Sequence, residues 1–101
     1  MKRMVRYKLK PECVEENERL VRRVYEELRT VAPPGLRYAT YRVAGGLGYV
    51  HIASTEGDVD HGMLTSLPSF KAFVAGVRER CTEPPVVVEL TPIGAYGLTD
   101  A

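Results

Sequence analysis

The feature that most constrains the fold is a pair of alternating segments around Gly45-Gly46. The chain reads LRYATYRVAGGLGYVHIAS from Leu36 to Ser54, with a glycine pair at its centre. Such a pair between alternating segments is a strong signal for a tight β-hairpin, because a type I′ turn needs a positive φ at both central positions. The turn then sets the register, which places Tyr49 opposite Arg42 and His51 opposite Thr40.

Alternation along this hairpin separates its side chains into two faces. The face expected to pack against helices carries Ala39, Tyr41, Val43, Val50 and Ile52. The opposite face carries Leu36, Tyr38, Thr40, Arg42, Tyr49, His51 and Ala53. This second face is mixed but aromatic, and it is too apolar to be a fully solvated surface.

The first 35 residues predict a strand and a helix. Residues Met4 to Lys10 alternate between apolar and basic side chains, which is typical of a half-buried strand. Pro11 suits the first turn of a helix, and an apolar stripe at helical spacing continues to Val31. Pro33-Pro34-Gly35 ends this helix and leads into the hairpin.

The last third of the chain predicts a loop, a second helix and a final strand. A polar loop runs from Thr55 to Thr65, and Ser66 and Pro68 then open the helix. The buried stripe of that helix is Phe70, Phe73, Val74, Val77 and Cys81, with Gly76 inside the helix and Pro84-Pro85 at its end. A strand from Val86 to Tyr96 follows, and Pro92 within it indicates an edge position or a bulge.

The element order β-α-β-β-α-β predicts an α+β fold of the ferredoxin-like type, with two helices on one face of a four-stranded antiparallel sheet. The length of 101 residues fits a single domain, residues 1–101. The helices leave the face of Tyr38, Tyr49 and His51 uncovered. We therefore expect a homodimer in which a second copy covers that face.

Composition excludes several classes of protein. The net charge of +1 gives no reason to expect nucleic acid, an anionic membrane or an acidic partner. No apolar run approaches the roughly 18 residues of a membrane span, and the basic start MKRMVRY lacks the apolar stretch of a signal peptide. Cys13 and Cys81 are too few for a disulfide framework, so we expect free thiols in a cytoplasmic protein.

Four stretches of the chain resemble the dimeric α/β-barrel superfamily, in particular proteins related to antibiotic-biosynthesis monooxygenases. They are VRYKLKPECVEENERLVRRVYEEL, PPGLRYATYRV, YVHIAS and SLPSFKAFVAGVRERCTEPPVV. The resemblance implies two sheets packed face to face into a barrel, with helices outside. It also implies a small-molecule cleft in each subunit, between sheet and helices. It indicates activity less strongly, because the superfamily hosts many functions.

The sequence departs from two activities of these relatives. The quinone-forming monooxygenases use a Trp with Tyr, Asn and Arg near the cleft, and this chain has no Trp. The haem-degrading relatives use a His on the second helix, with Asn and Trp elsewhere. The corresponding segment here, SFKAFVAGVRERC, has no His. Neither set of catalytic residues carries over residue by residue.

The candidate catalytic residues are Tyr41 and His61. In this hypothesis Tyr41 orients a substrate in the cleft while Tyr7 lines the wall, with Tyr25 as a further candidate for the lining. His61, in the loop expected to roof the cleft, takes a proton because imidazole titrates near neutrality. The plainer alternative is that the tyrosines belong to the core, with satisfied hydroxyls, and that His61 is solvated.

The candidate ligand-binding residues are Tyr7, Tyr38 and His51. His51 lies mid-strand near Tyr38, where it would serve as a ligand anchor or a proton shuttle. The alternative is a hydrogen-bonded histidine at the dimer interface. The loop EGDVDHG alternates carboxylates as calcium loops do, but His61 stands where such a loop needs Gly and Leu67 where it needs Glu. We expect no metal and no cofactor.

The sequence therefore favours cofactor-independent oxygenation of a small aromatic substrate, with a non-catalytic ligand-binding or structural dimer as the alternative. A more remote alternative is an RNA-binding module. GGLGYVHI, from Gly45 to Ile52, partly matches the third-strand signature of RNA-recognition domains, which share this element order. The balanced charge argues against that alternative, because phosphate contacts need Lys and Arg.

Overall fold

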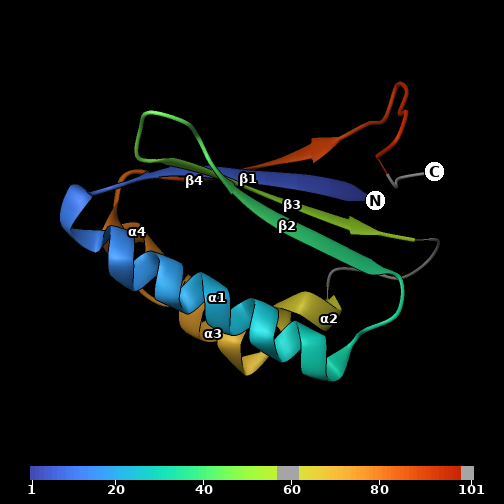
Figure 1. Cartoon of the computed structure of the whole chain (residues 1–101), viewed down its shortest axis with the longest axis horizontal. Helices are drawn as coiled ribbons and strands as arrows, with labels where there is room; N and C mark the ends of the chain where they lie inside the picture. Colours follow the sequence, from blue (N-terminus) through green and yellow to red (C-terminus); the bar gives the residue numbers. More distant parts are fainter. Residues whose placement is uncertain (57–61, 99–101) are drawn as a thin grey trace.

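The computed structural model describes residues 1–56 and 62–98. Its strands are β1 (Lys2–Leu9), β2 (Leu36–Arg42), β3 (Gly48–Thr55) and β4 (Cys81–Leu90). Its helices are α1 (Val14–Val31), after a 3-10 turn η1 (Pro11–Cys13), and the short α2 (Gly62–Thr65), α3 (Pro68–Val74) and α4 (Val77–Arg80). The strands form one antiparallel sheet in the order β2-β3-β1-β4, and the helices cover one face of it (Figure 1). This is the predicted ferredoxin-like α+β fold.

The predicted hairpin register is confirmed. Arg42 pairs with Tyr49 and Thr40 pairs with His51. The turn differs from the expected type I′ form, because of the two central glycines only Gly45 has a positive φ, at 76°. The backbone N–H of Gly46 donates to the carbonyl of Val43 at 3.4 Å, which places Gly45 at the third position of the turn. A left-handed residue at that position is typical of a type II turn, which also favours glycine there.

The two faces of the hairpin are exchanged relative to the sequence-based expectation. Tyr49, His51 and Ala53 face the helices and are 3%, 3% and 8% exposed. Tyr41 and Val43 lie on the outer face and are 58% and 51% exposed. The helix-covered face is buried despite its polar atoms because those atoms find partners inside the molecule, as described below.

The second predicted helix is also wrong in its extent. Gly76 has a φ of 80° and separates α3 from α4, so a left-handed residue interrupts the expected continuous helix. Cys81 begins β4, and Pro84-Pro85 lie inside that strand. Because β4 is at the edge of the sheet, it tolerates the missing proline N–H groups. The strand ends at Leu90, before Pro92.

The core lies between the sheet and the helices. Its centre includes Leu9 from β1, Val24 from α1 and Phe73 from α3. Cys13 and Cys81 are free thiols, as predicted. Among the described residues, no helix combines the length and the apolar character of a membrane-spanning segment.

Candidate functional site

A cavity of about 300 Å³ lies between the inner face of the sheet and the helices α2 to α4. Most of its wall is apolar, and Phe70 and Phe73 supply the aromatic part of the helix side. Four polar side chains of the sheet line it: Arg3 and Tyr7 from β1, Tyr38 from β2 and His51 from β3. A small apolar enclosure with a few convergent polar groups is the usual form of a small-molecule site.

The structure brings together all three residues predicted to bind a ligand. Tyr7 faces the helices, as expected. Tyr38 and His51 reach the cavity because the hairpin faces are exchanged, so they do not lie on the outer face where a dimer partner was expected.

Of the two residues predicted to be catalytic, the structure describes only Tyr41, which does not line the cavity. Tyr41 is on the outer face of the sheet, opposite to Tyr7, so the expectation that these two share a cleft is wrong. The reason is the exchange of faces: Tyr41 pairs with Val50, whose neighbour His51 is the buried one. His61 lies outside the described residues, as does most of the loop considered for calcium. Within residues 1–56 and 62–98 no group of three or more His, Cys, Asp or Glu side chains could hold a metal ion.

A chain of hydrogen bonds leads from a buried cation to the cavity. Arg80 Nε donates to Asn17 Oδ1 at 3.0 Å, and Asn17 Nδ2 donates to Tyr7 Oη at 3.0 Å. Tyr7 Oη lies 2.7 Å from His51 Nε2. On the other side of the imidazole, His51 Nδ1 lies 2.7 Å from Tyr38 Oη and 3.1 Å from Thr40 Oγ1. Asn17, His51 and Arg80 are 0%, 3% and 6% exposed, so this chain is inside the protein.

The directions of these hydrogen bonds follow from Arg80, whose guanidinium can donate a hydrogen bond but cannot accept one. A guanidinium only donates, so the atom of Asn17 that faces Arg80 must be the amide oxygen. The amide nitrogen then donates to Tyr7, whose own hydroxyl hydrogen has His51 Nε2 as its acceptor. His51 Nε2 therefore carries no proton, and a neutral His51 holds its proton on Nδ1.

The proton on His51 Nδ1 points toward the cavity end of the chain. It is donated to Tyr38 Oη or to Thr40 Oγ1. Thr40 Oγ1 is also 2.7 Å from Tyr25 Oη, so the hydroxyl of Tyr25, on α1, is the last group at this end of the hydrogen-bond chain. When the proton goes to Tyr38, the Tyr38 hydroxyl hydrogen is left for another acceptor, and Thr40 is one such acceptor within the site.

Burial keeps the chain uncharged except at Arg80. Desolvation lowers the pKa of His51 to about 4, so the imidazole is neutral at pH 7. Desolvation also raises the pKa of Tyr7, an effect that the hydrogen bond from Asn17 partly offsets. It raises the pKa of Tyr38 as well. The part of the cavity wall formed by described residues consequently offers hydrogen-bond donors and contains no carboxylate.

Arg80 is held by the end of α3 rather than by an acid. Its Nη2 donates to the carbonyl of Phe73 at 2.6 Å and its Nη1 to the carbonyl of Ala75 at 3.2 Å. These carbonyls belong to the last turn of α3, whose partial negative charge favours a cation. Among the described residues no carboxylate lies within salt-bridge distance of Arg80. The left-handed Gly76 turns the chain so that α4 can return Arg80 to this position.

The aromatic rings hold the imidazole in place. His51 stacks on Phe73 at a centroid distance of 5.3 Å and lies 5.3 Å from the ring of Tyr7. Tyr38 packs between Tyr25, at 5.4 Å, and Phe70, at 6.4 Å. The polar tips therefore have little freedom to leave the hydrogen-bond chain.

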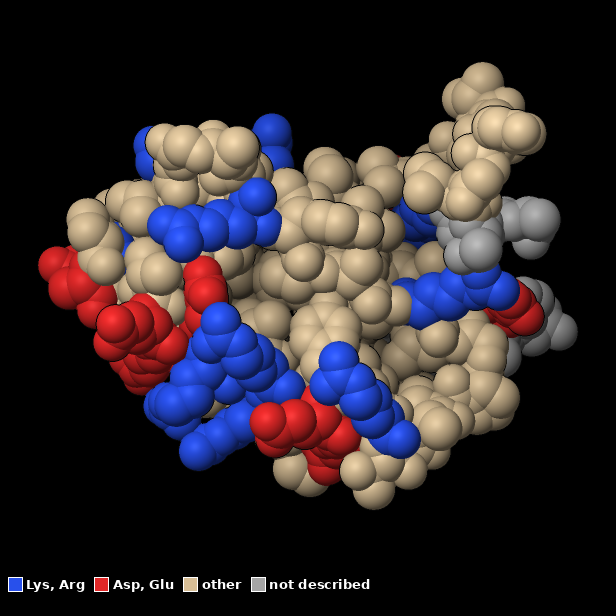
Figure 2. All heavy atoms as spheres, in the orientation of Figure 1, with Lys and Arg blue, Asp and Glu red and all other residues tan. Residues whose placement is uncertain are grey.

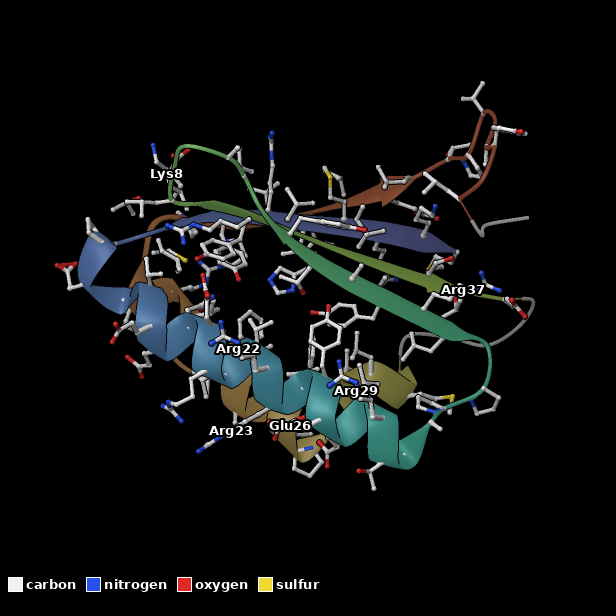
Figure 3. The ribbon with its side chains drawn as sticks, in the orientation of Figure 1. Lys8, Arg22, Arg23, Glu26, Arg29 and Arg37 are labelled. Atoms are coloured by element: carbon white, nitrogen blue, oxygen red, sulfur yellow. The ribbon has the colours of Figure 1, made fainter. Side chains whose placement is uncertain are left out.

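A separate polar cluster lies at the outer end of this face. Tyr49 donates to Glu18 at 2.5 Å, and Arg22 and Arg42 lie 3.1 and 3.7 Å from the same carboxylate. Burial first, and then the hydrogen bond to Glu18, raises the pKa of Tyr49 to about 12. Figure 2 shows Lys and Arg side chains gathered along α1 with acidic side chains among them, and Figure 3 places Arg22, Arg23, Glu26 and Arg29 on that helix. This charge belongs to a solvated helix surface.

Sequence reasoning missed three members of the site: Asn17, Thr40 and Arg80. A signal for Asn17 was present, because it shares the buried stripe of α1 with Leu20, Val21 and Val24 at helical spacing. A polar residue on such a stripe needs a buried partner. No comparable signal marks Arg80, because its position depends on the left-handed Gly76.

The fold is similar to that of several solved structures. No protein-family model and no curated protein sequence matches the chain. Rv0793 from Mycobacterium tuberculosis aligns over 93% of this chain and 95% of its own, with a TM-score of 0.77 and 22% identity. PA3566 from Pseudomonas aeruginosa aligns over 92% and 93%, with a TM-score of 0.74 and 16% identity. A solved antibiotic biosynthesis monooxygenase aligns over 90% and 98%, with a TM-score of 0.72 and 18% identity.

The chain has the fold of antibiotic-biosynthesis-monooxygenase-like proteins. The resemblance seen in the sequence is thereby confirmed for the fold. At these identities the likeness concerns the backbone arrangement, and activity has to be argued from the side chains of the cavity.

Proposed function

We propose that the cavity binds a small aromatic molecule with an enolic or phenolic oxygen, and that the protein oxygenates it without a cofactor. The observation that carries this proposal is the ordered hydrogen-bond chain from Arg80 to Tyr38, which ends at a mostly apolar, ring-lined cavity. The fold shared with an antibiotic biosynthesis monooxygenase supports it.

The proposed reaction needs only the substrate and molecular oxygen. In an anthrone-type substrate, a CH₂ group lies between aromatic rings, conjugated with a carbonyl. Loss of a proton gives an electron-rich enolate, whose carbon forms a bond to O₂. Both hydrogens of the CH₂ group leave with one oxygen atom as water, and the other oxygen atom stays as a new carbonyl. The substrate supplies all four electrons that O₂ takes up, so no external reductant is needed.

The residues of the chain stabilise the anion in this scheme. Tyr38 accepts from His51 and donates its own hydrogen to the enolate oxygen, which is a preorganised donor aimed at developing charge. The buried Arg80 cation polarises the chain from its far end. The walls of Phe70 and Phe73 exclude water from the anion. His61 remains the proposed acceptor of the substrate proton, because His51, with a pKa of about 4, is a weak base.

The residue types support the same proposal. The resembling quinone-forming monooxygenases use Tyr, Asn and Arg near the cleft together with a Trp. Here Tyr7, Asn17 and Arg80 form one hydrogen-bonded row beside the cavity, although the chain has no Trp.

Oxygen uptake with anthrone and dihydroxynaphthalenes tests the proposal. Tyr38→Phe is expected to lower kcat by about 10²-fold, the usual effect of removing one such donor. Tyr41→Phe is the matched control, because it removes the same atom from the outer face and should leave kcat unchanged. An absence of turnover by the wild-type protein, or equal turnover by Tyr38→Phe, would remove the oxygenase mechanism.

The alternative is a non-catalytic ligand-binding protein that uses the same cavity. It would bind the same aromatic compounds and take up no oxygen. RNA binding has less support, because the ring of Tyr49, which an RNA-recognition domain would stack on a base, is buried against α1 and donates to Glu18.

Homodimerisation is part of the proposal, through the outer face of the sheet. That face presents Met4, Tyr41, Val50, Ile52 and Val86, of which Tyr41 and Val86 are 58% and 46% exposed in the single chain. A second copy that packs its own sheet on this face would form the barrel implied by the resemblance.

The free thiols favour a reducing, cytoplasmic setting.

A further inference from the structure

The cavity has a second polar end, formed by Arg3 of β1. We propose that Arg3 binds a carboxylate of the ligand, so that the ligand is an aromatic acid whose hydroxyl or enol oxygen lies at the Tyr38 end. This inference rests on the proposed function because it concerns the same cavity, and it adds the chemical class of the molecule held there.

The strand geometry places Arg3 at the mouth of the cavity. Arg3, Val5 and Tyr7 alternate onto the inner face of β1, and all three line the cavity. Tyr7 is 4% exposed while Arg3 belongs to the exposed residues, so the row runs from solvent to the interior. The Cα atoms of Arg3 and Tyr7 are about 13 Å apart at the usual rise of a strand.

The Arg3 side chain has open donors. Among the described residues, no hydrogen bond and no ion pair involves the Arg3 guanidinium. Glu89 of β4 pairs with Arg3 in the register, but its carboxylate is not within the 4.0 Å of an ion pair. By contrast, Arg37 reaches Glu56 at 3.1 Å. A guanidinium at the edge of an apolar cavity matches a carboxylate, which it can hold with two parallel hydrogen bonds.

The distance between the two polar ends sets the size of the ligand. Arg3 pairs with Ala53, and Ala53 pairs with Tyr38, so the three residues form one row across β1, β3 and β2. Two strand spacings separate the backbones of Arg3 and Tyr38 by about 10 Å. Two fused aromatic rings with a carboxylate and a hydroxyl at opposite ends fit such a row, and their faces would lie against Phe70 and Phe73.

Calorimetric titration with two matched probes tests the inference. The probes are 2-naphthol and 6-hydroxy-2-naphthoate, which share the ring system and the hydroxyl and differ in the carboxylate. The wild-type protein is expected to bind the naphthoate about five- to tenfold more tightly, as a partly desolvated Arg–carboxylate pair provides. Arg3→Gln should abolish this preference and leave the affinity for 2-naphthol unchanged. Arg6→Gln, which removes the same charge from the outer face of β1, should retain the preference.

The outcomes separate this inference from the proposed function. If 2-naphthol binds and the naphthoate binds no better, the role of Arg3 is refuted while the aromatic site stands. A preference that survives Arg3→Gln, or that Arg6→Gln removes equally, also refutes it, because another cation or the overall charge would then be responsible. If neither probe binds, the proposed aromatic site fails together with the inference.

Discussion

Replacing Asn17 by aspartate is predicted to move the proton on His51 from Nδ1 to Nε2. In the wild-type protein, Arg80 fixes the amide so that its nitrogen donates to Tyr7, and Tyr7 donates to His51 Nε2. In the Asn17→Asp protein the new carboxylate would still accept from Arg80, but its second oxygen would accept from Tyr7. His51 Nε2 would lose its donor and become the donor to Tyr7 itself. Tyr38 would then donate to His51 Nδ1 and could no longer donate into the cavity.

The size of the effect follows from what each tautomer leaves unpaired. In the wild-type protein, a proton on Nε2 would leave the buried Tyr7 hydroxyl hydrogen without an acceptor. An unsatisfied buried group of this kind costs about 1–3 kcal/mol, which corresponds to a tautomer ratio of roughly 5 to 150. The Asn17→Asp variant should show a preference of similar size with the opposite sign.

Nitrogen-resolved NMR of ¹⁵N-histidine measures this preference directly. The chain has two histidines, so a His61→Gln variant assigns the signals of His51. Thr40→Val serves as the control, because Nδ1–H keeps Tyr38 as its acceptor and the tautomer should not change. A wild-type His51 protonated on Nε2, or the same protonated nitrogen in the wild-type and Asn17→Asp proteins, would refute the prediction.

Three further predictions concern stability and assembly. Phe73→Ala should lower the free energy of unfolding in urea by about 3–5 kcal/mol, because Phe73 is 7% exposed and packs on Tyr7 and His51. Val74→Ala, at a 48% exposed position, is the control and should change the urea midpoint little. Because the folded pKa of His51 is about 4 and the unfolded pKa about 6.5, its neutral form contributes stability that is fully present above pH 6.5 and is lost as pH falls toward 4. The free energy of unfolding should fall by about 3 kcal/mol over this pH range. A His51→Gln variant should lack this decline. A parallel decline in both proteins would show that His51 is not the group responsible. Sedimentation equilibrium should give twice the chain mass of 11.3 kDa, and Tyr41→Glu should shift it toward the monomer; a monomeric wild-type protein would refute the barrel.

The local patterns predicted the first three strands of the sheet well, whereas β4 begins and ends several residues earlier than predicted. The register of the hairpin follows from the position of Gly45-Gly46, and it is the register of the structure. The alternation of β1 also holds, since Tyr7 and Leu9 are buried while Arg6 and Lys8 are more exposed. These features depend on residues close in sequence, where alternation and turn chemistry are decisive.

The choice between the two faces of the hairpin could not be made locally. Both faces carry a tyrosine and aliphatic residues, so alternation alone does not show which one the helices cover. The deciding contact is the pairing of β1 with β3, which places Tyr7 opposite Tyr49 and continues the buried row of β1 onto the face of His51. The partners that satisfy the polar atoms of this face in the core include Asn17 of α1 and Arg80 of α4, which lie outside the hairpin.

The position of Arg80 was out of reach for a related reason. At helical spacing Gly76 reads as a residue inside one long helix, whereas its left-handed conformation divides that helix. The turn places the guanidinium at the end of α3 and beside Asn17. The site therefore depends on the left-handed backbone conformation of Gly76, which glycine adopts readily and residues with a side chain disfavour.

The most direct test of the account is the structure of the protein with 2-naphthol bound, determined without oxygen. The naphthalene rings are expected between the sheet and α3, against Phe70 and Phe73, with the naphthol oxygen within hydrogen-bond distance of Tyr38 Oη. A naphthol on the outer face beside Tyr41, or one inside the cavity with its oxygen directed away from Tyr38, would contradict it.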